Sequence, residues 1–173
     1  MGTAPGAAEP DPVTWAELPG WVKSVLSRVE LTEDCQNEDC QNLVARGHGR
    51  ESSCWLQNSL RAMLALQAYA DANAAKAFAG DFKMWCNNQL TGRCAISASN
   101  VSLRESPTVC HIKRHSGQRV RRVPVTVDPS GRVFMGAHIR IGRRGRLHYY
   151  DDMAGTGKMY VGYIGSHLST SDS

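Results

Sequence analysis

Histidine, arginine and tyrosine occupy alternating positions in one short stretch of the chain, HIRIGRRGRLHYYDD, which begins at His138. RNA cleavage without a metal needs a base for the 2′-hydroxyl, a proton donor for the leaving oxygen and positive charge at the phosphate. This stretch contains side chains for all three tasks. We predict His138 or His148 as the base, Tyr150 as the proton donor, and Arg140 with Arg146 as the phosphate ligands.

Positive charge is concentrated in the same part of the chain. Residues 111–148 carry ten lysine and arginine residues against Asp128 alone, whereas the whole chain of 173 residues has a net charge of +4. A basic region of this kind attracts polyanions and is typical of proteins that bind nucleic acid. The alternative is a solvated basic face that keeps the protein in solution, and charge by itself does not separate the two.

Apolar and polar residues alternate from Val123 to Tyr163, which is the period of β-strands. The turn sequences DPSG, GRRG and MAGTG separate four such segments, so the pattern predicts a four-stranded antiparallel meander. Odd-numbered side chains should face the core and even-numbered ones the opposite surface. That surface would carry basic, imidazole and aromatic groups: Arg122, Phe134, His138, Arg140, Arg146, His148, Tyr150, Lys158 and Tyr160, with Arg143 and Arg144 at its rim.

The even-numbered surface has the side chains expected of a site for single-stranded nucleic acid, and for RNA in particular. Arginine pairs with phosphate in a bidentate geometry, and exposed tyrosine or phenylalanine stacks on unpaired bases. In the alternative interpretation, residues 91–117 cover Phe134 and Tyr160, and the two rings belong to a second, smaller core with an arginine fringe.

The first half of the chain is expected to be helical and to pack against the sheet. Apolar residues recur at helical spacing over 21–30 and over a longer stretch, 54–79, and Asp81 is expected to cap a shorter helix. Gly, Ala and Pro dominate residues 1–13, which predicts a flexible tail. The expected fold class is α+β, with a single domain over 14–173 that is mainly helical over 14–90 and an antiparallel sheet over 119–168.

Six cysteines and the composition of the N-terminal residues bear on location and metal binding. The start of the sequence lacks the pattern of a secretory signal, and no apolar run is long enough to cross a bilayer, so we expect a cytoplasmic protein with reduced thiols and no membrane contact. A C-x4-C-x7-H-x5-C pattern could hold a structural zinc ion, with free cysteines on a polar loop as the alternative. Its members are Cys35, Cys40, His48 and Cys54.

Residues 145–168 read GRLHYYDDMAGTGKMYVGYIGSHL, an arginine-bearing strand, an acidic turn and a final strand. This segment resembles the close of RelE/ParE superfamily toxins, whose last strand has the form iyVlxiGH, and the resemblance extends over residues 53–168. It implies a sheet whose exposed basic and aromatic residues act on messenger RNA or, in the ParE branch, engage gyrase. By position it assigns such roles to Arg146, Tyr150 and His167, and it implies an antitoxin as a protein partner.

The sequence therefore favours a nucleic-acid-binding protein with RNA as its ligand, and it raises the hypothesis of a metal-independent ribonuclease of the RelE type that uses no cofactor. The main alternative is a noncatalytic module for protein interaction or regulation. In that alternative the arginine and aromatic surface binds another protein, and zinc at the cysteine pattern stabilises the fold.

Overall fold

The computed structural model of the protein describes residues 14–47, 49–88 and 96–170. The expected tail, residues 1–13, and the zinc candidate His48 lie outside the described residues. Every helix in the described part of the chain is too short or too polar to cross a lipid bilayer. The described elements form a mixed structure of helices and sheet, as expected for an α+β protein.

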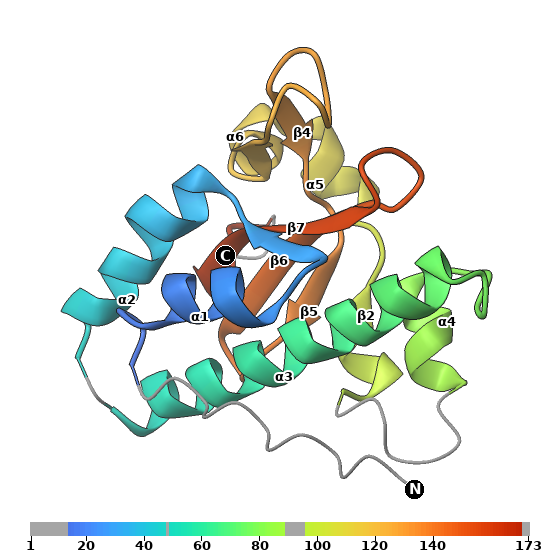
Figure 1. The fold of residues 1–173 in the computed structure, drawn as a ribbon. Coiled ribbons are helices and arrows are strands. Elements are labelled where there is room, and N and C mark those ends of the chain that lie inside the picture. Colours follow the sequence, from blue (N-terminus) through green and yellow to red (C-terminus); the bar gives the residue numbers. More distant parts are fainter. Residues whose placement is uncertain (1–13, 48, 89–95, 171–173) are drawn as a thin grey trace, which may run out of the picture.

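Five strands form the main sheet in the order β1-β7-β6-β5-β2 (Figure 1). Strand β1 pairs in parallel with β7, whereas the other neighbours are antiparallel. Two further strands, β3 and β4, form a separate antiparallel pair. The expected four-stranded antiparallel meander is therefore wrong, although β5, β6 and β7 do follow one another as antiparallel neighbours. The strands are β1 (Val29–Leu31), β2 (Val101–Ser102), β3 (Val120–Arg122), β4 (Arg132–Phe134), β5 (His138–Arg140), β6 (Gly145–Asp152) and β7 (Lys158–Ser166).

Local chemistry explains why the first expected strand is short. Pro124 has no N–H to donate to a partner strand, and the chain turns at once, with the N–H of Val127 donating to the carbonyl of Pro124 at 2.9 Å. The DPSG turn forms as expected, since the N–H of Gly131 donates to the carbonyl of Asp128 at 2.8 Å. The alternating residues from Val123 to Val127 therefore lead into a turn and do not continue the strand.

Eight helical segments surround the strands in the described residues. The long helix α3 begins and ends a few residues earlier than the apolar spacing predicts, and Asp81 caps α4 as expected, its Oδ1 accepting from the N–H of Met84 at 2.8 Å. The helix expected over 21–30 is wrong in its second half, because α1 ends at Val25 and β1 follows. The segments are α1 (Leu18–Val25), the π-helical turn η1 (Cys35–Asp39), α2 (Cys40–Ala45), α3 (Arg50–Ala74), α4 (Phe82–Asn87), the 3₁₀ turn η2 (Ala98–Asn100), α5 (Pro107–His111) and α6 (Lys113–Gly117).

Hydrophobic cores lie on both faces of the main sheet. Figure 1 shows α3 on one side of the sheet and α5, α6 and β4 on the other. Side chains of α3, such as Leu60 and Leu66, belong to one large core with Ile139 and Leu147 of the sheet. A smaller core on the opposite side consists of Val123, Val133, Met135 and Tyr160. The sheet is thus the middle layer, and its second face is partly covered by α5, α6, β4 and the smaller core, which together we call the covering layer.

A bulge lets the covering layer lie directly on the sheet. His148 pairs with Tyr163 and Tyr149 pairs with Val161, so Gly162 is the extra residue in β7. A Cβ atom at this position would overlap Sδ of Met135, which belongs to the covering layer. Because glycine has no side chain here, Met135 packs down onto the sheet. His148, expected on an open surface, is only 2% exposed.

Candidate functional site

Two histidines face each other across β5 and β6 beneath the covering layer. His138 pairs with His148 in the strand register, and their ring centroids are 4.9 Å apart. His138 reaches the surface with a side chain that is 15% exposed, whereas His148 lies below it. The structure therefore brings the two predicted bases together but gives access to only one of them.

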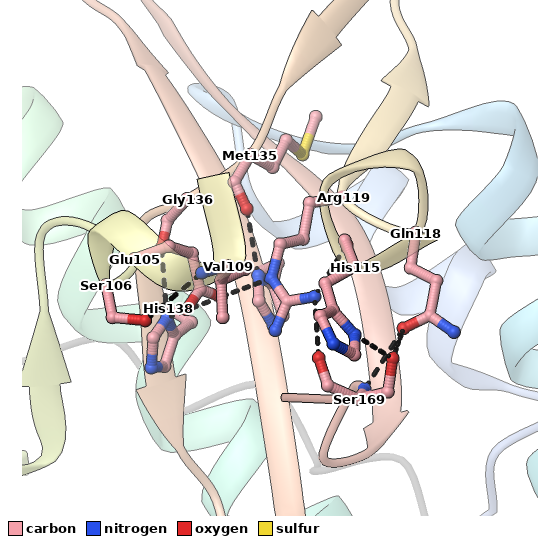
Figure 2. A network of polar contacts seen from close by, with 11 residues as sticks. Glu105, Ser106, Val109, His115, Gln118, Arg119, Met135, Gly136, His138 and Ser169 are labelled. Carbon is pink, nitrogen blue, oxygen red and sulfur yellow. Dashed lines mark hydrogen bonds and ion pairs between the residues drawn. The ribbon is translucent and has the colours of Figure 1, made fainter. Parts of the chain in front are cut away.

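A buried ion pair holds the loop before α5 against these rings. Arg119, which directly precedes β3, donates from Nε to Oε1 of Glu105 at 2.5 Å, and the two side chains are 1% and 8% exposed. Figure 2 shows Glu105 next to His138, with Arg119 reaching across to it. Oε1 of Glu105 also lies 3.7 Å from Nδ1 of His138. We call Glu105, Arg119, His138 and His148 the buried polar cluster.

Backbone carbonyls fix the protonation of both imidazoles. Nδ1 of His138 lies 2.9 Å from the carbonyl of Gly136, and Nδ1 of His148 lies 2.9 Å from the carbonyl of Met135. Since a carbonyl only accepts, each Nδ1 carries the proton, and Nε2 of each neutral ring has a free lone pair.

Burial keeps the two imidazoles neutral. It lowers the pKa of His148 to about 3, and the hydrogen bond to Met135 offsets this only in part. Burial also lowers the pKa of His138, against the opposing effects of the Gly136 hydrogen bond and the Glu105 carboxylate. A neutral ring with a free Nε2 is the form that a general base requires.

Two features of the buried polar cluster have opposite effects on metal binding. Glu105, His138 and His148 do place one potential metal ligand each within 4.8 Å of one another. Both Nδ1 atoms donate to carbonyls, which leaves Nε2 of each ring free, as is usual for metal-binding histidines. However, Arg119 compensates the charge of Glu105. The nearby arginines add further positive charge, which lowers the pKa of both histidines. Residues of the right type and protonation for a metal are therefore present, whereas the surrounding positive charge opposes one.

Two arginines lie opposite each other at the outer end of the same strands. Arg140 of β5 pairs with Arg146 of β6, and within residues 14–47, 49–88 and 96–170 neither forms an ion pair with a carboxylate. Like charges directly opposite each other destabilise a sheet. Burial and the charge of Arg140 both lower the pKa of Arg146, whose Nη1 donates to the carbonyl of Gly145 at 2.8 Å.

The segment after β7 brings a third histidine to this end of the sheet. The N–H of His167 donates to the carbonyl of Arg144 at 2.6 Å, and burial, followed by the charges of Arg146 and His138, lowers the pKa of its imidazole. His167 is exposed. We call His138, Arg140, Arg146 and His167 the cationic patch.

Ser169 anchors the segment that carries His167. Its Oγ lies 2.8 Å from Oε1 of Gln118 and 2.7 Å from Nδ1 of His115, and its carbonyl accepts from Arg119 at 3.2 Å (Figure 2). The same arginine therefore orders the loop of Glu105 and the segment of His167. It is a positioning residue for both sides of the cationic patch.

The remaining predicted residues of the even-numbered surface are dispersed. Arg143 and Arg144 are exposed in the turn between β5 and β6, at the rim as expected. Lys158 forms an ion pair with Glu30 of β1. Arg122 lies on β3 of the separate sheet, and its Nε is 3.7 Å from Oδ1 of Asp34. The expectation that all these groups share one open surface is wrong, because that surface is interrupted by the covering layer.

The predicted aromatic residues have two different environments. Tyr160 is 3% exposed and belongs to the smaller core, so the second core of the alternative interpretation does exist for this ring. Its buried core partners in the described residues are Val123, Val133 and Met135, whereas the alternative expected residues 91–117 to cover it. Phe134 remains 38% exposed, and together with Tyr150 it lines a hollow of about 440 Å³. We call this the apolar hollow; Leu103, Arg104, Glu105, Gly136, Ala137 and Asp151 are among its other lining residues. Tyr150 thus lies at the opposite end of β6 from Arg146.

The cysteine pattern is only partly assembled in the described residues. Cys35 begins the π-helical turn and Cys40 begins α2; both are buried, with a hydrogen bond between their thiols. Cys54 is exposed on α3, where its Sγ accepts from Nδ2 of Asn58 at 3.4 Å. A zinc ion at this pattern stays a prediction.

Sequence reasoning missed Glu105 and Arg119, the best-buried charges of the site. One signal could have identified the carboxylate, because Glu105 is the only acidic residue between Asp81 and Asp128 and lies just before the most basic part of the chain. A lone carboxylate there is a candidate for an internal ion pair. Arg119 has no comparable signal, since it is one of many arginines.

The chain matches no family model, no curated protein and no solved structure. The resemblance to RelE/ParE toxins therefore stays a prediction, and any function has to be argued from the site itself.

Proposed function

We propose that the protein binds single-stranded RNA at the cationic patch and cleaves it without a metal. The observation that carries this proposal is the arginine pair of β5 and β6, which has no carboxylate partner in the described residues and lies beside His138 and His167. A sheet that keeps two like charges opposite each other loses stability, and a bound phosphate would recover it.

His138 and His167 suit the two proton transfers of RNA cleavage. Nε2 of His138 would take the proton of the 2′-hydroxyl while the 2′-oxygen bonds to phosphorus. The bond from phosphorus to the 5′-oxygen breaks, and protonated His167 would give that oxygen its proton. Arg140 and Arg146 would stabilise the charge on the phosphate oxygens. The products are a 2′,3′-cyclic phosphate and a 5′-hydroxyl, so atoms and protons balance.

This assignment changes the roles expected from the sequence. His148 is buried under Met135, so it supports His138 instead of contacting RNA. Tyr150 lies by the apolar hollow, away from the arginine pair, so His167 replaces it as the proposed proton donor. A negative phosphate would raise the pKa of His167, which favours the protonated form in the complex.

Binding is tested by fluorescence anisotropy with a labelled single-stranded RNA across a series of salt concentrations. Each phosphate contact on a single strand contributes about 0.7 to the slope of log affinity against log salt, so R140Q/R146Q should reduce the slope by about 1.4. The control is R122Q/R132Q, which removes the same charge from a cross-strand pair on β3 and β4. The proposal would be contradicted if both double variants reduced the salt slope equally, or if the unmodified protein did not bind RNA at low salt.

Cleavage is tested in a chelating buffer, with detection of the cyclic phosphate. H138N keeps a donor for the carbonyl of Gly136 but removes Nε2, and it should slow cleavage by about 10²–10⁴-fold with little loss of RNA affinity. H167N should also slow cleavage by about 10²–10⁴-fold with little loss of RNA affinity. RNA binding without any cleavage by the unmodified protein would refute the catalytic part and favour the noncatalytic alternative.

A further inference from the structure

We infer that the apolar hollow binds a guanine base. The link to RNA rests on the proposed function, whereas recognition of the base rests only on the hollow itself. The hollow lies where β4 leads into β5, next to the buried polar cluster, and Glu105 lines both.

The walls of the hollow suit a flat aromatic ligand. Phe134 and Leu103 are among the large hydrophobic side chains that remain exposed, at 38% and 37%, and both line this hollow with Tyr150. The ring of Phe134 lies against Gly136, where a Cβ atom would be 2.9 Å from the ring. An exposed aromatic ring in a concave apolar site is a stacking surface that each base can use.

Two charged side chains on the edge of the hollow select among the bases. Asp151 is held in place, because its Oδ2 accepts from the hydroxyl of Tyr69 at 2.7 Å and its Oδ1 from the N–H of Met153 at 3.0 Å. Each carboxylate oxygen keeps a further lone pair, and the residue is exposed. Arg104 is exposed as well and has no carboxylate partner in the described residues.

Guanine matches this pair of charges. Its N1–H and N2–H₂ groups donate side by side to a carboxylate, and its O6 and N7 atoms accept side by side from a guanidinium. Adenine and cytosine present one exocyclic donor group to Asp151, and uracil presents carbonyls beside its single N–H. A guanine in the hollow would therefore satisfy both Asp151 and Arg104.

The hollow is also placed correctly for a nucleotide of the proposed RNA ligand. Ala137 lines it, and Arg140 follows three residues later along β5, which corresponds to roughly 10 Å in an extended strand. His138 lies between them. A base in the hollow would put its own ribose near His138 and the next phosphate near the arginine pair.

The test is calorimetric titration of the full chain with the 5′-monophosphates of guanosine, adenosine, cytidine and uridine, repeated with guanosine alone. We expect guanosine monophosphate to bind about tenfold more tightly than the other three, and D151N and R104Q each to remove that preference. F134L should weaken all four ligands by removing the stacking surface. D71N on α3 and V125A, an exposed apolar residue outside the hollow, are the matched controls.

The outcomes separate this inference from the proposed function. Guanosine binding that is lost in D151N and kept in R140Q/R146Q supports the hollow even where RNA is not cleaved. Equal affinity for guanosine and uridine monophosphates, or a preference that survives both D151N and R104Q, overturns it. R104Q decides the matter where D151N fails to fold, because Arg104 is exposed and makes no ion pair in the described residues.

Discussion

Replacement of Arg119 by methionine should destabilise the protein more than any exposed substitution. The side chain is 1% exposed, donates to Glu105, and also donates from Nη1 to the carbonyls of His115 at 2.8 Å and Ser169 at 3.2 Å. Methionine fills similar space but leaves a buried carboxylate and two carbonyls without their donor. Loss of one partner of a buried ion pair costs about 3–5 kcal/mol. For a chain of this size that corresponds to a fall in Tm of about 6–20 °C.

Urea denaturation at pH 7.5 measures this cost, with R132M as the exposed control that should change the free energy of unfolding by no more than about 0.5 kcal/mol. The double variant E105L/R119M removes the uncompensated charge, so its loss should be well below the sum of the two single losses. A loss under about 1 kcal/mol for R119M, or strict additivity in the double variant, would refute a structural role for the ion pair.

Two further changes test the packing of the covering layer onto the sheet. The pKa of His148 is lower in the folded protein, about 3, than the 6.5 of the free side chain, so its contribution to stability is complete above pH 6.5 and declines as the pH falls. Between pH 7.5 and 5 the unmodified protein should lose about 2 kcal/mol of its free energy of unfolding, whereas H148N should not. Urea denaturation in a chelating buffer measures both, and equal losses would disprove the contribution of His148. G162A should cost about 1–3 kcal/mol because the added methyl displaces Met135, whereas G20A, with open space around the new methyl, should be neutral or stabilising in the same assay; equal effects would contradict the close packing.

Part of the fold follows directly from local patterns. The apolar spacing of α3, the Asp81 cap and the antiparallel arrangement of β5, β6 and β7 all depend on residues close together in sequence, and all three are confirmed. The pairing of β1 with β7 depends on two segments at opposite ends of the chain, and a three-residue strand has no periodicity of its own. No local rule could have predicted it.

In the candidate site, too, the local features could be predicted from the sequence and the long-range ones could not. Alternation correctly places His138, Arg140, Arg146 and His148 on one face of the strands, because side-chain direction is a local property. Whether that face is open depends on Met135 and on the bulge at Gly162, which the alternation does not reveal. For this reason the arginine pair was predictable, whereas the burial of His148 and the ion pair of Arg119 with Glu105 were not.

The place of β7 in the sheet has a consequence for synthesis of the chain. This late strand lies between β1 and β6, so the early strand β1 has no strand to pair with until β7 has been made. The apolar side of α3 likewise lacks its sheet partners, such as Ile139 and Leu147, until the late strands follow. At about 5–20 residues per second, the ribosome needs roughly 4–18 s to pass from the end of α3 to β7. During that interval the nascent chain exposes the apolar side of its longest helix in the described residues, so we expect it to bind chaperones and prematurely terminated chains to aggregate.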